Sequence, residues 1–101
     1  MTVVSRVSKT NNILEIKVGE IFDFSQHQSF RNAYQGVDLR RVPIVVDLTA
    51  TRHMDSSALG MLLVLRERAG GESADICLVG MNEAISKVLE VSRFEELFRL
   101  R

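Results

Sequence analysis

The residues of this chain whose types and spacing could support chemistry are Asp55, Ser56 and Ser57, which open a helical pattern directly after a polar loop. A buried strand over residues 44–46 is predicted before that loop. One carboxylate and two adjacent hydroxyls at a helix start have two interpretations. They can cap the free amide groups of the first helical turn, as Asp and Ser commonly do. Alternatively, one of the serines can receive a phosphoryl group.

Phosphorylation at this place is physically compatible with a folded domain. A phosphoserine carries about −1.5 to −2 charges at neutral pH. The amide groups and the macrodipole at a helix N-terminus tolerate such a charge. The modification is therefore expected to change what can dock on the surface and to leave the fold intact.

The helix after Ser57 carries more apolar surface than a single packed face requires. We expect a neighbouring helix to bury the surplus, and a partner-binding surface is the alternative. Gly60 leaves a gap at which another backbone could approach closely. The face expected in the core contains Ala58, Leu62, Leu65 and Ala69 with Met61 beside it, whereas Leu59 and Leu63 occupy a flank and Val64 lies further round.

Other chemistry finds little support in the sequence. His27 and His53 are separated by a whole strand and have no companion ligands, so we expect no metal site. A pairing of Ser56 with His53 lacks a third orienting group and an oxyanion loop, so we expect no enzyme. The glycines form no phosphate-cradling motif, and we expect no cofactor. Cys77 lies within an apolar strand and is predicted to be a core residue.

The bulk composition is that of one soluble globular domain spanning residues 1–101. Apolar residues make up 46% and charged residues 26%, and 13 basic residues balance 13 acidic ones. This balance gives no basic excess of the kind that direct nucleic-acid binding uses. A single cysteine forms no internal disulfide, and no apolar run has the length of a membrane span. Together with the missing signal-peptide pattern, these features favour a cytoplasmic location without membrane contact.

The first half of the chain predicts a β-hairpin and then a helix. Strands are expected over residues 3–7 and 13–18, joined by turn residues at Asn11-Asn12. Ser25 and Gln28 match a capping box at the start of a helix that Gly36 ends. The apolar stripe of that helix is Phe30, Ala33 and Tyr34.

The second half continues the alternation of strands and helices. Residues 76–79 predict a short buried strand, Gly80 a turn, and Asn82 the cap of a third helix. One further helical turn and a short terminal strand follow. The order β-β-α-β-α-β-α-β predicts an α/β fold with a mixed sheet of four to five strands and interleaved helices.

Several stretches of this chain resemble the STAS domains of the anti-sigma factor antagonist family. The core of the resemblance is a strand ending in Val-Val-Asp-Leu followed by Met54-Asp55-Ser56-Ser57-Ala58-Leu59-Gly60. Gly19-Glu20 with nearby Asp23 and the strand 76–79 with Gly80 support it. The resemblance covers nearly the whole chain and implies a single STAS-type domain. Two positions depart from the pattern: Ala58 and Arg93 stand where the family often has glycine.

The resemblance implies a regulatory module that works by partner switching. In that family the unphosphorylated antagonist binds an anti-sigma factor, usually a serine kinase with a histidine-kinase-like ATP fold, and thereby frees a sigma factor. The kinase phosphorylates the serine after the motif aspartate, here Ser56, and a PP2C-type phosphatase reverses the reaction. Some systems place both activities in one response regulator. The partner-binding residues expected here are Asp23, Asp55, Ser56, Ser57, Leu59, Gly60 and Leu63. A STAS binding module of a transporter, a lipid-trafficking complex or a sensor scaffold is the alternative, one without phosphorylation.

Overall fold

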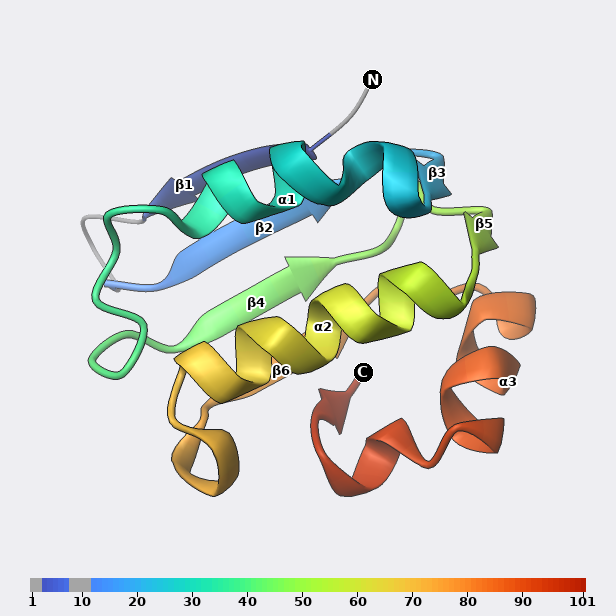
Figure 1. Cartoon of the computed structure of the whole chain (residues 1–101). Coiled ribbons are helices and arrows are strands. Elements are labelled where there is room, and N and C mark those ends of the chain that lie inside the picture. The colour runs from blue at the N-terminus through green and yellow to red at the C-terminus, as the bar shows by residue number, and fades with distance from the viewer. Residues whose placement is uncertain (1–2, 8–11) are drawn as a thin grey trace.

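Alternating and continuous apolar runs assemble into one five-stranded sheet in the computed structural model, which describes residues 3–7 and 12–101 (Figure 1). The strands, in their order across the sheet, are β1 (Val3–Val7), β2 (Leu14–Val18), β4 (Ile44–Asp47), β6 (Ile76–Val79) and β7 (Arg99–Leu100). The pairing of β1 with β2 is antiparallel, and the other three pairings are parallel. The predicted mixed sheet is confirmed.

The hairpin at the start of the sheet is also confirmed. Val3 pairs with Val18 and Val7 with Leu14. Asn12 adopts a left-handed conformation with φ of 53°, which suits the residue type expected in the turn. Asn11 lies outside the described residues.

Three α-helices connect the parallel strands. They are α1 (His27–Tyr34), α2 (Ser56–Arg68) and α3 (Glu83–Val91). Three short 3₁₀ turns accompany them: η1 (Phe24–Gln26), η2 (Gly71–Ser73) and η3 (Phe94–Glu96). Figure 1 shows α1 and α2 lying side by side across one face of the sheet, with α3 beside the N-terminal end of α2.

The core lies between the sheet and this layer of helices. Inward residues of β2 and β4 such as Ile16 and Val46 are fully buried, and Phe30, Leu62 and Leu65 from α1 and α2 pack over them. The helix stripes predicted from the sequence therefore point inward. Cys77 is buried as predicted, although it lies outside this main cluster.

From β6 onward the chain follows the predicted element boundaries closely. The Asn82 side chain accepts a hydrogen bond of 2.8 Å from the Ile85 amide and so caps α3. Gly80, directly after β6, has a φ of 78°, and Gly36, shortly after α1, has a φ of 82°; both values are typical of turn glycines. Arg93 has a φ of 59°, a left-handed conformation that glycine adopts more readily than arginine.

The predicted start of the first helix is wrong. Ser25 and Gln28 do not form a capping box, because the Ser25 hydroxyl and amide both donate to the Asp23 carboxylate. The Gln28 side chain instead donates to Asn32 at 2.9 Å. The chain therefore makes the 3₁₀ turn η1 first, and α1 begins two residues after Ser25.

Gly80 offers a direct test of the packing between the loops that follow β4 and β6. A Cβ atom at this position would lie 2.2 Å from Thr49 Oγ1 and 3.1 Å from two Thr49 backbone atoms. We expect Gly80→Ala to lower the free energy of unfolding by about 2 kcal/mol, through this clash and the unfavourable positive φ. Urea denaturation would measure the change.

Gly60→Ala is the matched control for that substitution. Nothing lies within 4 Å of a Cβ atom at Gly60, which is a helical residue of α2. This variant should raise stability by about 0.5–1 kcal/mol because alanine is the better helix former. Equal effects of the two substitutions would contradict the packing described for Gly80.

Candidate functional site

Two very short strands bring the loops of the candidate site together. Strand β3 (Ile21–Phe22) pairs in parallel with β5 (His53–Met54), so that Phe22 lies opposite Met54. The backbone amide of His53 also donates to the carbonyl of Glu20 at 3.1 Å. The residues that follow the two strands are Asp23 and Asp55, and the parallel register places them next to each other at the same edge.

Each aspartate then forms the same kind of turn. The Asp55 carboxylate accepts hydrogen bonds from the Ser57 amide at 3.0 Å, the Ser57 hydroxyl at 2.6 Å and the Ala58 amide at 3.1 Å. The Asp23 carboxylate accepts from the amide and the hydroxyl of Ser25, the first at 2.9 Å. Asp55 therefore caps α2 and Asp23 caps η1, so the capping interpretation holds for Asp55.

Ser56 differs from Ser57 in both exposure and hydrogen bonding. Ser56 is exposed and is the first residue of α2. The Ser57 hydroxyl is committed to Asp55, whereas no described residue forms a hydrogen bond with the Ser56 hydroxyl. A group attached to Ser56 would therefore leave the helix cap in place.

One face of α2 continues outward from Ser56. Leu59, Gly60 and Leu63 follow it at spacings of three, four and seven residues, which places all four on one side of the helix. We call these four residues the docking stripe. Leu59 is half-buried against the core, Gly60 is exposed, and Leu63 is 40% exposed.

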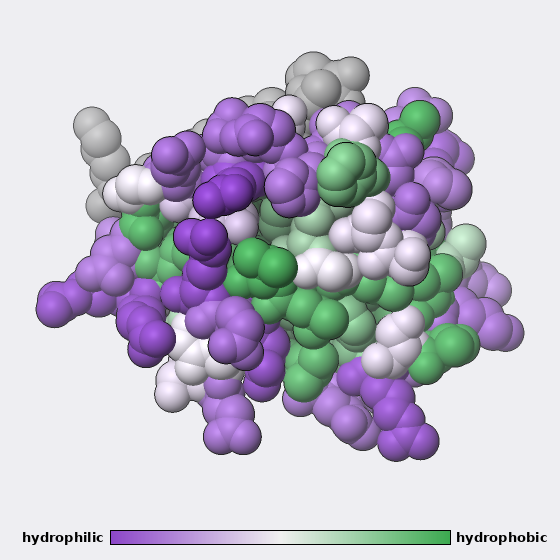
Figure 2. Space-filling model, in the orientation of Figure 1, coloured by the Kyte–Doolittle hydropathy of each residue, from purple (hydrophilic) through white to green (hydrophobic). Residues whose placement is uncertain are grey.

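The outward face of α2 is not covered by another helix. Leu63 and Val64 keep 40% and 49% of their surface exposed, so the expectation that a neighbouring helix buries the surplus is wrong for both. Figure 2 shows apolar surface in the middle of this side of the molecule, over α2. The alternative, a surface free for a partner, agrees with these exposures.

Sequence reasoning missed two residues of this region. Thr51 is only 1% exposed, and its hydroxyl donates to the Gly19 carbonyl at 2.9 Å, which ties the loop after β4 to the end of β2. No local signal marks a threonine in a polar loop as buried. Phe24 is 69% exposed and stacks on His27 with ring centroids 5.3 Å apart. The position of Phe24 next to Asp23, an expected partner-binding residue, was the signal in the sequence that could have identified it.

The Asp55 carboxyl is held in its charged form by the groups it accepts from. The hydrogen bond from the Ser57 hydroxyl has the largest effect, and it lowers the pKa of Asp55 below the usual 3.8. Burial acts in the opposite direction, while the amides of Ala58 and Ser57 and the nearby His53 lower the pKa further. Burial acts to raise the pKa of Asp47 at the end of β4, yet hydrogen bonds from Thr49 and the charge of Lys17 lower it overall.

Two kinds of feature are absent from the part of the chain that the structure describes. Residues 3–7 and 12–101 contain no cluster of three His, Cys, Asp or Glu side chains that could hold a metal ion. Over the same residues, each helix is too short or too polar to cross a bilayer.

Residues 5–100 match the family described as "Mlab, STAS domain". The chain belongs to the STAS-domain family. A STAS-domain-containing protein of Pseudomonas aeruginosa (strain UCBPP-PA14) is 43% identical over 100 residues, which cover 99% of each chain. The resemblance of this chain to STAS domains is thereby confirmed.

Solved structures share this STAS fold at low sequence identity. A putative anti-sigma factor antagonist of Thermotoga maritima superposes with a TM-score of 0.78 at 14% identity, covering 95% of this chain and 82% of the other. The Bacillus cell fate determinant SpoIIAA in its phosphorylated form gives 0.72 at 16% identity, covering 99% and 91%. The anti-sigma factor antagonist SpoIIAA in its unphosphorylated form gives 0.74 at 15% identity, covering 99% and 87%. These likenesses show the fold.

The Asp55 cap leads to a prediction about pH. Because the pKa of Asp55 in the folded state lies below its usual value, the charged carboxylate stabilises the fold above pH 3.8. This contribution is lost as the pH falls through the folded-state pKa, so wild-type stability should drop between about pH 5 and pH 2. Asp55→Asn should make this drop shallower, with Asp47 supplying part of what remains. Urea denaturation midpoints at pH 7 and pH 3 would measure it.

Asp55→Ala is the comparison variant. Asparagine can still cap a helix and alanine cannot. At pH 7 the alanine variant should melt lower than the asparagine variant, by roughly 5 °C for a domain of this size. If Asp55→Asn instead follows the wild-type midpoints in parallel from pH 7 to pH 3, the assigned role of this carboxylate is wrong.

Proposed function

We propose that this STAS domain is an anti-sigma factor antagonist that works by partner switching. The unphosphorylated form binds an anti-sigma factor through the docking stripe and the neighbouring residues Asp23, Asp55 and Ser57, and a sigma factor is released. A phosphoryl group on Ser56 ends this binding. The chain acts as a ligand and as a phosphorylation substrate and performs no catalysis itself.

The observation that carries this proposal is the contrast between the two serines. Ser57 completes the Asp55 cap, while Ser56 is exposed with a hydroxyl that contributes nothing to the described hydrogen bonds. Ser56 can therefore be modified without a loss of local structure. The solved neighbours add support, since their names describe an anti-sigma factor antagonist and a phosphorylated form.

The chemistry of the docking stripe suits an on–off switch. Leu59, Gly60 and Leu63 offer apolar contact area directly beside the Ser56 hydroxyl. A phosphate there would bring close to two negative charges into a surface that a partner must desolvate. A tenfold loss of affinity corresponds to only about 1.4 kcal/mol, so one phosphate suffices. The amide groups at the start of α2 accommodate the same charge in the free domain.

The partners follow from this role. An anti-sigma factor that is also a serine kinase would bind the docking stripe and phosphorylate Ser56. A PP2C-type phosphatase would remove the phosphate, and a response regulator carrying one or both activities is a further form that these partners can take. The exposed position of Ser56 at the start of α2 allows the active site of a second protein to reach it.

Substitution of Ser56 tests the switch. Ser56→Ala should bind the anti-sigma factor constitutively, and Ser56→Asp should bind at least about tenfold more weakly because of its charge. Both variants should keep a melting temperature close to that of the wild type, since the cap is made by Asp55 and Ser57. Calorimetry would measure the affinities of the wild type and of both variants for the anti-sigma factor. In a separate experiment, the wild type would be incubated with kinases encoded beside it, and mass spectrometry would map any phosphate.

The same experiment separates the proposal from its alternative. A binding module of a transporter, a lipid-trafficking complex or a sensor scaffold could use the docking stripe without the Ser56 hydroxyl. Equal binding by Ser56→Ala and Ser56→Asp, with no phosphate on Ser56 after incubation with any cognate kinase, would favour that alternative and overturn the switching mechanism.

Leu63 tests the docking stripe independently of phosphorylation. Leu63→Glu places a charge on the outward face of α2, where 40% of the leucine is exposed. We expect partner affinity to fall by at least about tenfold, because a charged group at the centre of an apolar contact is costly to desolvate. Val91→Glu is the matched control, since Val91 is 76% exposed on α3. Equal affinities of the two variants would place the partner elsewhere.

A further inference from the structure

We propose that the groove between α1 and α2 binds a small amphiphilic anion, a single-chain molecule with an apolar body and one carboxylate, sulfate or phosphate group. This inference concerns binding by the free domain. It depends neither on phosphorylation of Ser56 nor on the identity of a protein partner.

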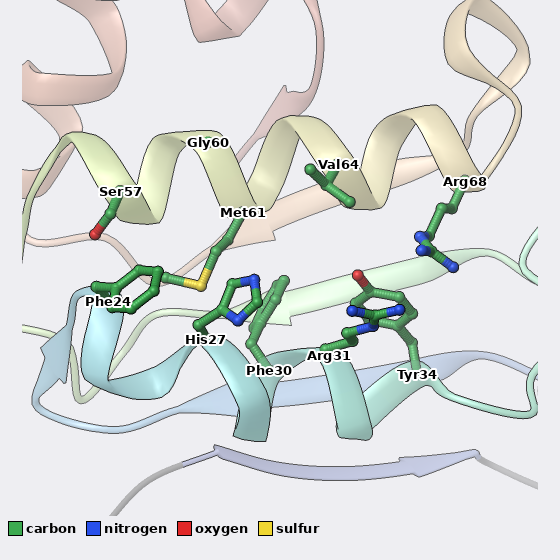
Figure 3. Close-up of a pocket in the computed structure, with 10 residues that line it drawn as sticks. All are labelled: Phe24, His27, Phe30, Arg31, Tyr34, Ser57, Gly60, Met61, Val64 and Arg68. Atoms are coloured by element: carbon green, nitrogen blue, oxygen red, sulfur yellow. The ribbon is translucent and has the colours of Figure 1, made fainter.

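The groove has the size and the lining of a small-ligand site. Its volume is about 330 Å³, near the lower end of the range of roughly 300–1,000 Å³ that such sites occupy. Figure 3 shows side chains from η1, α1 and α2 converging on the space between the helices. The apolar part is lined by Phe24, His27, Phe30, Gly60, Met61 and Val64.

The apolar part of the groove is open to an incoming ligand. Phe24 and Val64 expose 69% and 49% of their surface, although both are apolar. No atom lies within 4 Å of the position that a Cβ atom would take at Gly60, so the missing side chain leaves room along α2. A ligand chain placed here would cover apolar surface that the fold itself leaves in water.

The other end of the groove is built for an anion. Arg31 of α1 and Arg68 at the end of α2 line it together with Tyr34, and Figure 3 shows the three side chains gathered at that end. No described acidic residue forms an ion pair with either arginine. Two guanidinium groups without a described acidic partner can together bind a carboxylate or a phosphate.

Tyr34 supplies a hydrogen-bond donor at the same end. The residue is only 5% exposed, yet its hydroxyl forms no hydrogen bond with any described residue. Burial raises the pKa of Tyr34, and the charges of Arg68 and Arg31 act in the opposite direction, which places both guanidinium groups near the phenol. The neutral hydroxyl can therefore donate to an anion that the two arginines hold.

The arrangement favours a single-chain anion over other occupants. A cation with the same tail would meet two positive charges. A whole helix of a partner protein, about 10–12 Å wide with its side chains, occupies far more space than the 330 Å³ of this groove. Inorganic phosphate alone would leave the apolar part uncovered. An amphiphilic anion satisfies the apolar and the basic ends together.

The test is a titration of the full chain with decanoate, followed by calorimetry and by amide chemical shifts. We expect saturable binding at a one-to-one ratio with a Kd no weaker than about 1 mM. Shift changes should gather on α1 and α2 around Met61 and Tyr34. The melting temperature should rise with decanoate concentration, because the ligand binds the folded state. Decyltrimethylammonium and inorganic phosphate should each bind at least about tenfold more weakly.

Variants locate the two ends of the site. The double variant Arg31→Gln/Arg68→Gln should weaken decanoate binding at least about tenfold, and Arg41→Gln is its control because Arg41 is a surface arginine outside the groove. Gly60→Leu should fill the apolar part and remove binding without lowering stability. Glu90→Leu, on the exposed surface of α3, is the control for the added leucine.

Four outcomes would overturn the inference. They are the absence of saturable decanoate binding, equal binding of decanoate and decyltrimethylammonium, unchanged affinity in Gly60→Leu, and a melting temperature that falls with decanoate. If decanoate does not bind while a protein partner contacts the groove residues, the groove is assigned to that partner's side chains. If Ser56→Ala and Ser56→Asp bind the protein partner equally while decanoate still binds, the proposed function is overturned and this inference remains valid.

Discussion

The parallel pairing of β3 with β5 is the constraint on which the candidate site depends. Each strand has only two residues, yet Phe22 and Met54 are buried where the strands pair. The Glu20 carbonyl, just before β3, accepts hydrogen bonds from the backbone amides of Arg52 and His53. The buried Thr51 hydroxyl holds the same loop to the end of β2. The chain leaves both strands at one edge, and each aspartate that follows caps a helical turn. Two loops that are far apart in sequence thus present one surface.

Helix α2 connects this surface to the core. Its inner face, with Leu62 and Leu65 fully buried, is held by packing against the sheet. Its outer face presents Ser56 and Leu63 to solvent. Because the inner face anchors the helix, a charge added at Ser56 alters the potential and the hydration of the surface with little effect on the backbone. This is the physical basis of the proposed switch at Ser56.

The groove between α1 and α2 has a related origin. Helices that pack on one face of a twisted sheet need side chains to fill the space between them, and here Gly60 contributes none. Phe24 lies exposed at one end and two arginines without described acidic partners lie at the other. The same helix therefore borders two surfaces, one with the Ser56 hydroxyl and one with the basic groove.

Much of the fold was predictable because the signals are local. Alternation in β2, the apolar run of β4 and the caps at Asp55 and Asn82 depend on neighbouring residues, and the structure confirms each of them. The capping box at Ser25 failed because Asp23, two residues earlier, competes for the same hydroxyl and amide. Strands β3 and β5 escaped prediction since two residues carry no periodicity, and their pairing joins segments more than thirty residues apart in the chain.

The amino-acid sequence by itself determined the resemblance to the family, the order of the three helices and of the five strands of the main sheet, and the choice of Asp55, Ser56 and Ser57 as the motif of interest. The elements and the motif follow from residue types at short spacings, and the family follows from the resemblance of that motif. Only the tertiary structure decided that Ser57 binds Asp55 while Ser56 stays exposed, and that Leu63 and Val64 are uncovered. Burial and hydrogen-bond choice depend on what other segments bring to a residue, and a linear pattern does not contain that information.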